Sequence, residues 1–107
     1  MVALPSSLSI AVIGAGAGGL TAARSFLKRG VKNLTIFESS SHIGGVWKYS
    51  QDPTRPMYRN LQTNLPKEIM GFREYPFVNV SGADSNDDSY VTHEQVFDYL
   101  VDYTDHF

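Results

Sequence analysis

Apolar positions in the first forty residues predict a strand, a helix and a second strand. Residues 8–13 (LSIAVI) form a short apolar run that ends in glycines, which is typical of a buried strand. Residues 20–29 place apolar side chains at helical spacing, and Gly30 is the residue type expected where a helix stops. Residues 34–37 (LTIF) predict the second strand. The pattern therefore predicts one βαβ unit over residues 8–38, with a right-handed crossover.

The pattern becomes irregular after the second predicted strand. Residues 39–80 are interrupted by Gly-Gly and by several prolines, yet they carry more aromatic and aliphatic side chains than a plain linker does. Since long loops inside compact domains are usually functional or disordered, we expect this segment to be ordered by something that it wraps around. Residues 81–89 (SGADSNDDS) predict a polar, acidic, flexible loop.

The last sixteen residues predict an amphipathic helix over residues 92–107. Thr92 and Gln95 have the spacing of a capping box at its start. Tyr90, Tyr99 and Tyr103 are expected to serve in packing and interfaces. The predicted inward stripe is Val96, Phe97, Leu100, Val101, Thr104 and Phe107, while Asp98, Asp102 and Asp105 are predicted to face water.

Composition excludes several classes of protein. With 42% hydrophobic residues the chain is typical of a globular domain rather than of a disordered or fibrous protein. The absence of cysteine excludes disulfides, thiolate metal sites and a cysteine nucleophile. No basic, apolar leader and no apolar run of about 20 residues is present, so we expect neither a signal peptide nor a membrane span in this chain. The default location is then the cytoplasm.

The formal charge of −2 hides an asymmetry along the chain. Residues 1–83 hold all nine Lys and Arg against four acids, whereas residues 84–107 hold seven acids and no Lys or Arg. A basic body suits an anionic ligand such as a dinucleotide, although on charge alone two differently solvated surfaces are the preferred explanation. The cations are scattered, so we expect no nucleic-acid partner. His42, His93 and His106 lack metal-ligand spacing, so we expect no metal, and His93 and His106 are expected to be polar helix residues.

The turn after the first strand has the pattern GxGxxG. Its residues are Gly14, Ala15, Gly16, Ala17, Gly18 and Gly19. In a dinucleotide fold Gly14 permits the tight turn, Gly16 admits a pyrophosphate and Gly19 allows close packing of helix and strand. Glu38 follows Gly19 by 19 residues, at the end of the second strand, where a carboxylate accepts hydrogen bonds from ribose hydroxyls and repels a 2′-phosphate. The first site is therefore expected to hold FAD or NAD rather than NADP.

A second glycine pair lies just beyond Glu38. Gly44 and Gly45 allow close backbone approach, and they are followed by Val46 and by Trp47, which offers a flat face to a ring system. The residues alone allow two readings: contact with a further stretch of cofactor, or a Gly-Gly turn with Trp47 as a core anchor.

Taken together, these motifs resemble the N-terminal part of the flavin-containing monooxygenases. The similarity covers residues 9–107, with a variable gap around residues 79–88. The Gly-Gly-x-Trp and Thr-Asn-x-Pro-Lys-Glu pieces are more specific than the nucleotide fingerprint. The similarity to this family rests on the following segments: Gly14–Gly19, Glu38, Gly44–Trp47, Met57-Tyr58, Leu61–Glu68, Met70, Phe72–Phe77 and the helix up to His106-Phe107.

The resemblance implies an incomplete α/β fold: a partial Rossmann-type FAD-binding domain over residues 1–107, with the family's NADP domain absent from this chain. It implies a monooxygenase that binds FAD, is reduced by NADPH and uses O₂ to oxygenate a soft nitrogen or sulfur of a small amine or sulfide.

Site residues follow from the same resemblance. It places Gly14–Gly19 on the diphosphate, Glu38 on the ribose, and Gly45, Val46 and Trp47 further along the cofactor. It places Thr63 and Asn64 at the flavin–nicotinamide junction, with Asn64 as the catalytic residue. Spacing alone favours a plain turn role for Asn64, before Leu65-Pro66.

Two other functions stay open. The first is a non-catalytic module that binds FAD or another nucleotide. The second, which is less favoured, is a fragment of an NAD-linked dehydrogenase. Because the family's NADP domain is absent, the isolated chain is expected to bind FAD weakly at most and to turn over no substrate.

Overall fold

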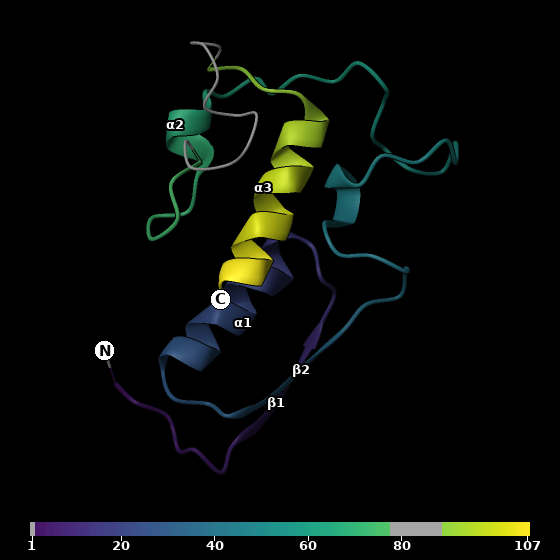
Figure 1. The fold of residues 1–107 in the computed structure, drawn as a ribbon. Coiled ribbons are helices and arrows are strands. Elements are labelled where there is room, and N and C mark those ends of the chain that lie inside the picture. Colours follow the sequence, from purple (N-terminus) through teal and green to yellow (C-terminus); the bar gives the residue numbers. More distant parts are fainter. Residues whose placement is uncertain (1, 78–88) are drawn as a thin grey trace. The chain divides into compact units, whose positions relative to one another are not determined.

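The computed structural model describes residues 2–77 and 89–107 (Figure 1). The chain divides into two compact units, residues 1–45 and residues 46–107. The loop predicted at residues 81–89 lies outside the described residues, apart from Ser89.

The first unit contains two parallel strands joined by a helix. Strand β1 (Ser9–Ile13) pairs with β2 (Asn33–Phe37), in a register that sets Ser9 opposite Asn33 and Ile13 opposite Phe37. Helix α1 (Ala17–Lys28) connects the strands and packs against both. The βαβ unit predicted from the apolar pattern is therefore confirmed.

Helix α1 covers only one face of this two-stranded sheet. Val12 on β1 is buried together with Leu20 and Ala23 on α1. On the opposite face Ile13 is 81% exposed and Phe37 is 56% exposed. The prediction of a buried first strand is thus wrong for every strand residue except Val12, because side chains alternate between the faces and nothing described in this unit covers the second face.

Both ends of α1 are set by glycine. The helix starts at Ala17, three residues before the predicted start, because Gly18 and Gly19 enter its first turn although glycine is a poor helix former. Gly30 has a φ of +97° and its N–H donates to the Leu27 carbonyl oxygen at 3.0 Å, which confirms the predicted stop.

The second unit is organised on helix α3 (His93–His106). Thr92 caps the helix through the predicted capping box with Gln95. A stretch of the preceding loop runs antiparallel to the start of α3: the Thr63 N–H donates to the Val91 carbonyl and the His93 N–H to the Leu61 carbonyl. The segment predicted as irregular also contains two short helices, η1 (Gly45–Trp47) and α2 (Lys67–Met70).

The buried face of α3 differs from the predicted stripe. Val96 and Leu100 are buried as predicted, whereas Phe97, Val101 and Thr104 are half-buried and Phe107 is 38% exposed. The buried face of α3 includes Tyr99 and Tyr103, because the loop at residues 72–77 packs against their rings. The buried residues of the helix are His93, Val96, Tyr99, Leu100 and Tyr103.

Tyr99 ties this loop to the helix. Its hydroxyl accepts a hydrogen bond from the Phe72 N–H at 2.8 Å and donates to the Tyr75 carbonyl at 2.6 Å. Its ring stacks on Phe77 at a centroid distance of 4.4 Å. Burial raises the pKa of Tyr99, so the hydroxyl keeps the proton that it donates.

Replacing Tyr99 with Phe should destabilise the second unit. The variant keeps the ring but leaves the Phe72 N–H and the Tyr75 carbonyl without their partner, which costs about 1–3 kcal/mol of unfolding free energy. Urea unfolding of the wild-type chain and of Tyr99→Phe measures the difference. Tyr58→Phe is the matched control, since Tyr58 is 61% exposed and should be replaceable at no cost. Equal midpoints for all three chains would show that the Tyr99 bonds contribute nothing.

Candidate functional site

The glycine loop leaves β1 and turns immediately across the end of β2. The Gly14 N–H donates to the Phe37 carbonyl at 2.7 Å, and Gly14 has a φ of +98°, a conformation that side chains with a Cβ rarely adopt. The loop therefore lies at the carboxyl ends of two adjacent parallel strands, where ligands bind in open α/β sheets.

Gly19 lets α1 pack directly on this loop. A Cβ at Gly19 would collide with the Gly14 carbonyl oxygen and would lie 2.9 Å from its carbonyl carbon and 3.5 Å from Val12 Cγ1. At Gly18, by contrast, a Cβ would have no neighbour within 4 Å. The close helix–strand packing predicted for the last glycine of the motif is confirmed.

The start of α1 is open to an anion. Its N-cap residue is Gly16, so no side chain caps the helix, and the first turn holds no acidic residue. Among the hydrogen bonds of the described residues, none is donated by the N–H groups of Gly16–Gly19. These donors at the positive end of the helix dipole fit the charge of a diphosphate.

Glu38 stands beside the loop and is bonded to it. Its Oε1 accepts from the Ala15 N–H at 2.8 Å, and its Oε2 accepts from the N–H and the hydroxyl of Ser40 at 2.9 and 2.8 Å. The bond from Ala15, followed by those from Ser40, lowers the pKa of Glu38 from 4.5 to about 2. The carboxylate stays charged at neutral pH, and its remaining lone pairs can accept hydroxyl groups of a ligand.

The Glu38 carboxyl should therefore titrate well below an ordinary glutamate. Because the folded pKa is lowered, its contribution to stability is present above pH 4.5 and is lost as the pH falls from 4.5 towards 2. Carbon-13 NMR of the Glu38 carboxyl measures the midpoint, which we expect near 2. Ser40→Ala, which removes one donor, should move the midpoint upward. A midpoint at 4.5 in the wild-type chain would contradict the bonding described.

The second glycine pair approaches the glycine loop itself. The Gly44 N–H donates to the Ala15 carbonyl at 2.9 Å, and a Cβ added to Gly45, whose φ is +58°, would lie 3.0 Å from the Gly16 Cα. The sequence analysis left a cofactor contact and a plain turn open for this pair. The structure shows a turn that braces residues 15–16.

The site residues predicted from the resemblance fall in both units. Gly14–Gly19, Glu38 and Gly45 belong to the first unit and lie together there. The second unit holds the other four: Val46 is 52% exposed, Trp47 is half-buried, Thr63 is buried and Asn64 is exposed in a bend.

Thr63 and Asn64 use their side chains differently. The Thr63 hydroxyl donates to the Leu65 carbonyl and accepts from the Val91 N–H, so it fixes the loop. No hydrogen bond among the described residues involves the Asn64 amide, which leaves it available to a ligand.

Two polar residues of the site regions were missed by the sequence analysis. Ser40 supplies two of the three bonds to Glu38, and its position two residues along the chain is the signal that could have indicated it. His93, predicted as a polar helix residue, is 1% exposed. Its Nε2–H donates to the Arg59 carbonyl at 2.8 Å, an interaction that spacing alone does not reveal.

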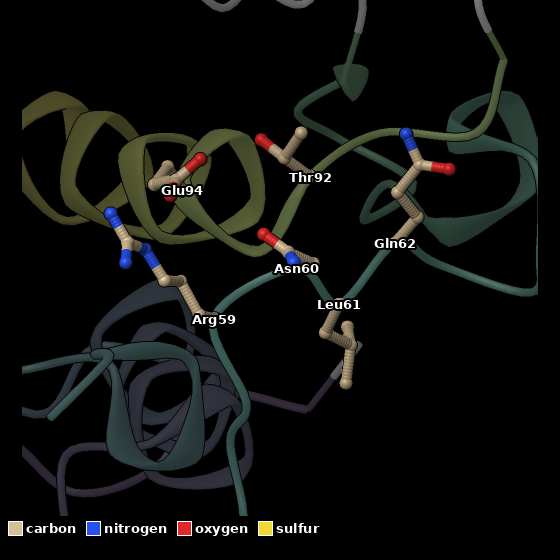
Figure 2. A pocket seen from close by; sticks show the side chains of 6 residues that line it. All are labelled: Arg59, Asn60, Leu61, Gln62, Thr92 and Glu94. Carbon is tan, nitrogen blue, oxygen red and sulfur yellow. The ribbon is translucent and has the colours of Figure 1, made fainter. Parts of the chain in front are cut away.

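The second unit has a polar hollow of about 250 Å³ at the start of α3 (Figure 2). Figure 2 shows Arg59 and Glu94 at one end of the view, Asn60 in the middle and Gln62 at the other end. The remaining lining residues are Leu61 and Thr92. Charges of both signs line this hollow, so it has no clear preference for an anion or a cation.

The described residues form neither a metal-binding cluster nor a membrane-spanning helix. Among residues 2–77 and 89–107, no three His, Asp or Glu side chains gather where a metal ion could bind. No helix described is both long and apolar enough to cross a bilayer.

Known proteins resemble this chain over nearly its whole length. The family model "Flavin-binding monooxygenase-like" matches residues 7–107. Flavin-containing monooxygenase FMO GS-OX5 from Arabidopsis thaliana is 42% identical and is matched over 95% of this chain and 26% of its own length. Putative flavin-containing monooxygenase FMO GS-OX-like 11 from the same plant is 40% identical, over 92% of this chain and 67% of that protein.

Solved structures agree with these relatives. S-allyl-L-cysteine S-oxygenase from Allium sativum matches with a TM-score of 0.76 and 41% identity, over 92% of this chain and 25% of that one. Tmm from Pelagibacter sp. strain HTCC7211 matches with a TM-score of 0.71 and 29% identity. The chain spans about a quarter of the length of most of these proteins, and its parallel βαβ start is an incomplete Rossmann-like α/β fold. The chain belongs to the flavin-binding monooxygenase family.

Proposed function

We propose that this chain supplies the FAD-binding part of a flavin monooxygenase that depends on NADPH and O₂. The observation that carries the proposal is the open start of α1, where the N–H groups of residues 16–19 have no acceptor within the described part of the chain and lie beside a charged Glu38. In a member of this family, that combination suits a flavin dinucleotide.

Each group of the first unit has a proposed task. The N–H groups at the start of α1 bind the diphosphate, and Glu38 accepts the ribose hydroxyls with the lone pairs that Ala15 and Ser40 leave free. A 2′-phosphate would meet the Glu38 charge, so this site favours FAD over NADP. Gly45 holds the loop in shape by bracing Gly16.

The second unit is proposed to contact the cofactor further along, through Val46 and Trp47. Asn64 is the proposed catalytic residue, because its exposed amide both donates and accepts hydrogen bonds at the flavin–nicotinamide junction. Thr63 is a positioning residue in this proposal, since both of its hydroxyl bonds are used within the loop. Bound FAD would supply the redox chemistry and the activation of O₂, which no side chain of this chain can supply.

The proposed substrates are small molecules with a soft nitrogen or sulfur. Sulfur is favoured by one relative, because the 41% identical structure is that of an S-allyl-L-cysteine S-oxygenase. The contacts that select the substrate are proposed to come from sequence that this chain does not contain, as the relatives are about four times as long.

Mixing the purified chain with FAD and NADPH tests the proposal against its alternatives. We expect FAD binding, measured by quenching of flavin fluorescence, and no oxidation of NADPH at 340 nm by the chain alone. Oxidation of NADPH would exclude a non-catalytic module. Binding of NAD without binding of FAD would instead favour a fragment of an NAD-linked dehydrogenase and would overturn the proposal.

A further inference from the structure

A second hollow in the unit of residues 46–107 has aromatic walls. It is a half-open hollow of about 330 Å³ beside the first turns of α3, a volume at the lower end of the range of small-molecule sites. It involves neither the glycine loop nor Glu38, and it shares only Trp47 with the proposed cofactor contacts. The residues that line it are Trp47, Lys48, Tyr49, His93, Glu94, Phe97 and Asp98.

The rings of this hollow suit a cation. Trp47, Tyr49 and Phe97 each present a π system, whose face attracts positive charge. The Lys48 Nζ already lies 4.7 Å from the centroid of the Phe97 ring. One wall of the hollow therefore binds an ammonium group of the protein itself.

Negative charge outweighs positive charge in the lining of the hollow. Glu94 and Asp98 lie one helical turn apart on α3 and bring two carboxylates, against the single charge of Lys48. This distinguishes the aromatic hollow from that of Figure 2, where Arg59 lies with Glu94.

We propose that this hollow binds a small alkylammonium ion, with its alkyl groups against the rings and its N–H groups directed to the carboxylates of Glu94 and Asp98. A protonated amine has no nitrogen lone pair to be oxygenated, so the hollow holds the cation rather than reacting with it. The inference does not rest on the proposed monooxygenase activity.

Trp47 gives a direct readout, because it is the single tryptophan of the chain. The chain is titrated at constant ionic strength with tert-butylammonium chloride and with its uncharged isostere tert-butanol, following Trp47 fluorescence and the line width of the tert-butyl proton resonance. Tetramethylammonium chloride carries the charge without an N–H. We expect tert-butylammonium to bind most tightly, tetramethylammonium more weakly, and tert-butanol at least roughly tenfold more weakly than tert-butylammonium.

Matched variants locate the binding. Asp98→Asn and Phe97→Leu should each weaken tert-butylammonium binding roughly threefold or more, while Lys48→Met, which removes the resident ammonium, should strengthen it. Asp105→Asn makes the same charge change on an exposed residue of α3 outside the hollow and should leave the affinity unchanged. Circular dichroism confirms that each variant is folded.

Three outcomes would overturn the proposal. The first is equal affinity for tert-butylammonium and tert-butanol, which would mark the hollow as merely apolar. The second is an affinity that Asp98→Asn and Asp105→Asn change equally, which would mark a general charge effect. The third is the absence of a saturable change in both the Trp47 fluorescence and the tert-butyl resonance.

Discussion

Replacing Gly19 with Ala is expected to destabilise the first unit more than any other single substitution in the glycine loop. The added Cβ would collide with the Gly14 carbonyl oxygen, and Gly14 cannot retreat easily because its own N–H is bonded to the Phe37 carbonyl. Forcing an extra methyl into such a contact costs typically 1–3 kcal/mol and more when backbone must move, so we expect at least about 3 kcal/mol here. Chemical unfolding measures the loss, and the proposed FAD binding should be lost with it.

Gly18→Ala is the matched control, one residue away in the same helical turn. A Cβ at Gly18 has no neighbour within 4 Å, and its φ is not positive. Alanine in a helix is favoured over glycine by about 1 kcal/mol, so this variant should be as stable as the wild-type chain or more so. If the two alanine variants changed the free energy of unfolding by the same amount, helix propensity would explain both changes. The claim that Gly19 packs too closely on Gly14 to accept a Cβ would then be wrong.

Local sequence patterns predicted most of the first unit. The short apolar runs, the glycine spacing and the position of Glu38 depend on neighbours along the chain, so they could be recognised from the sequence alone. What they could not show is how much surface a strand buries. Whether Ile13 and Phe37 are covered depends on a second layer, and in this unit only α1 supplies a layer.

In the second unit, less of the structure could be predicted from local sequence patterns. The capping box of α3 is local and was predicted correctly. The orientation of the helix was not, because it depends on a loop some 25 residues earlier, whose Phe72 and Tyr75 bond to the Tyr99 hydroxyl. A tyrosine can face either water or the core, so hydropathy alone does not place it. The burial of His93 escaped prediction for the same reason, since its partner is the distant Arg59 carbonyl.

Glu38 was predicted from spacing as a ribose ligand, and the structure adds that it also organises the loop. Ala15 and Ser40 donate to its two oxygens, so the carboxylate is held in place before any ligand arrives. Preorganisation of this kind lowers the cost of binding. Whether the charge acts on a ligand as well as on the loop is a separate question, which an isosteric substitution can answer.

Glu38→Gln is expected to weaken FAD binding roughly tenfold or more and to narrow the preference for FAD over NADP⁺. The glutamine oxygen can still accept from the Ala15 N–H, but its NH₂ group then faces the donors of Ser40 and has fewer lone pairs for ribose hydroxyls. Loss of the negative charge also removes the repulsion of a 2′-phosphate. Titration of FAD and of NADP⁺ against both chains gives the two affinities and their ratio.

The ratio of the FAD affinity to the NADP⁺ affinity distinguishes a direct contact between Glu38 and the ligand from a purely structural role of Glu38. Damage to the loop would lower both affinities together, whereas a ribose contact predicts that FAD loses affinity and NADP⁺ loses less or gains. Glu68→Gln is the control, because it makes the same chemical change on an exposed carboxylate that accepts only from the Ser89 hydroxyl among the bonds described. It should change neither affinity. If Glu38→Gln left both the FAD affinity and the ratio at their wild-type values, Glu38 would serve the loop alone, and the proposed ribose contact would be excluded.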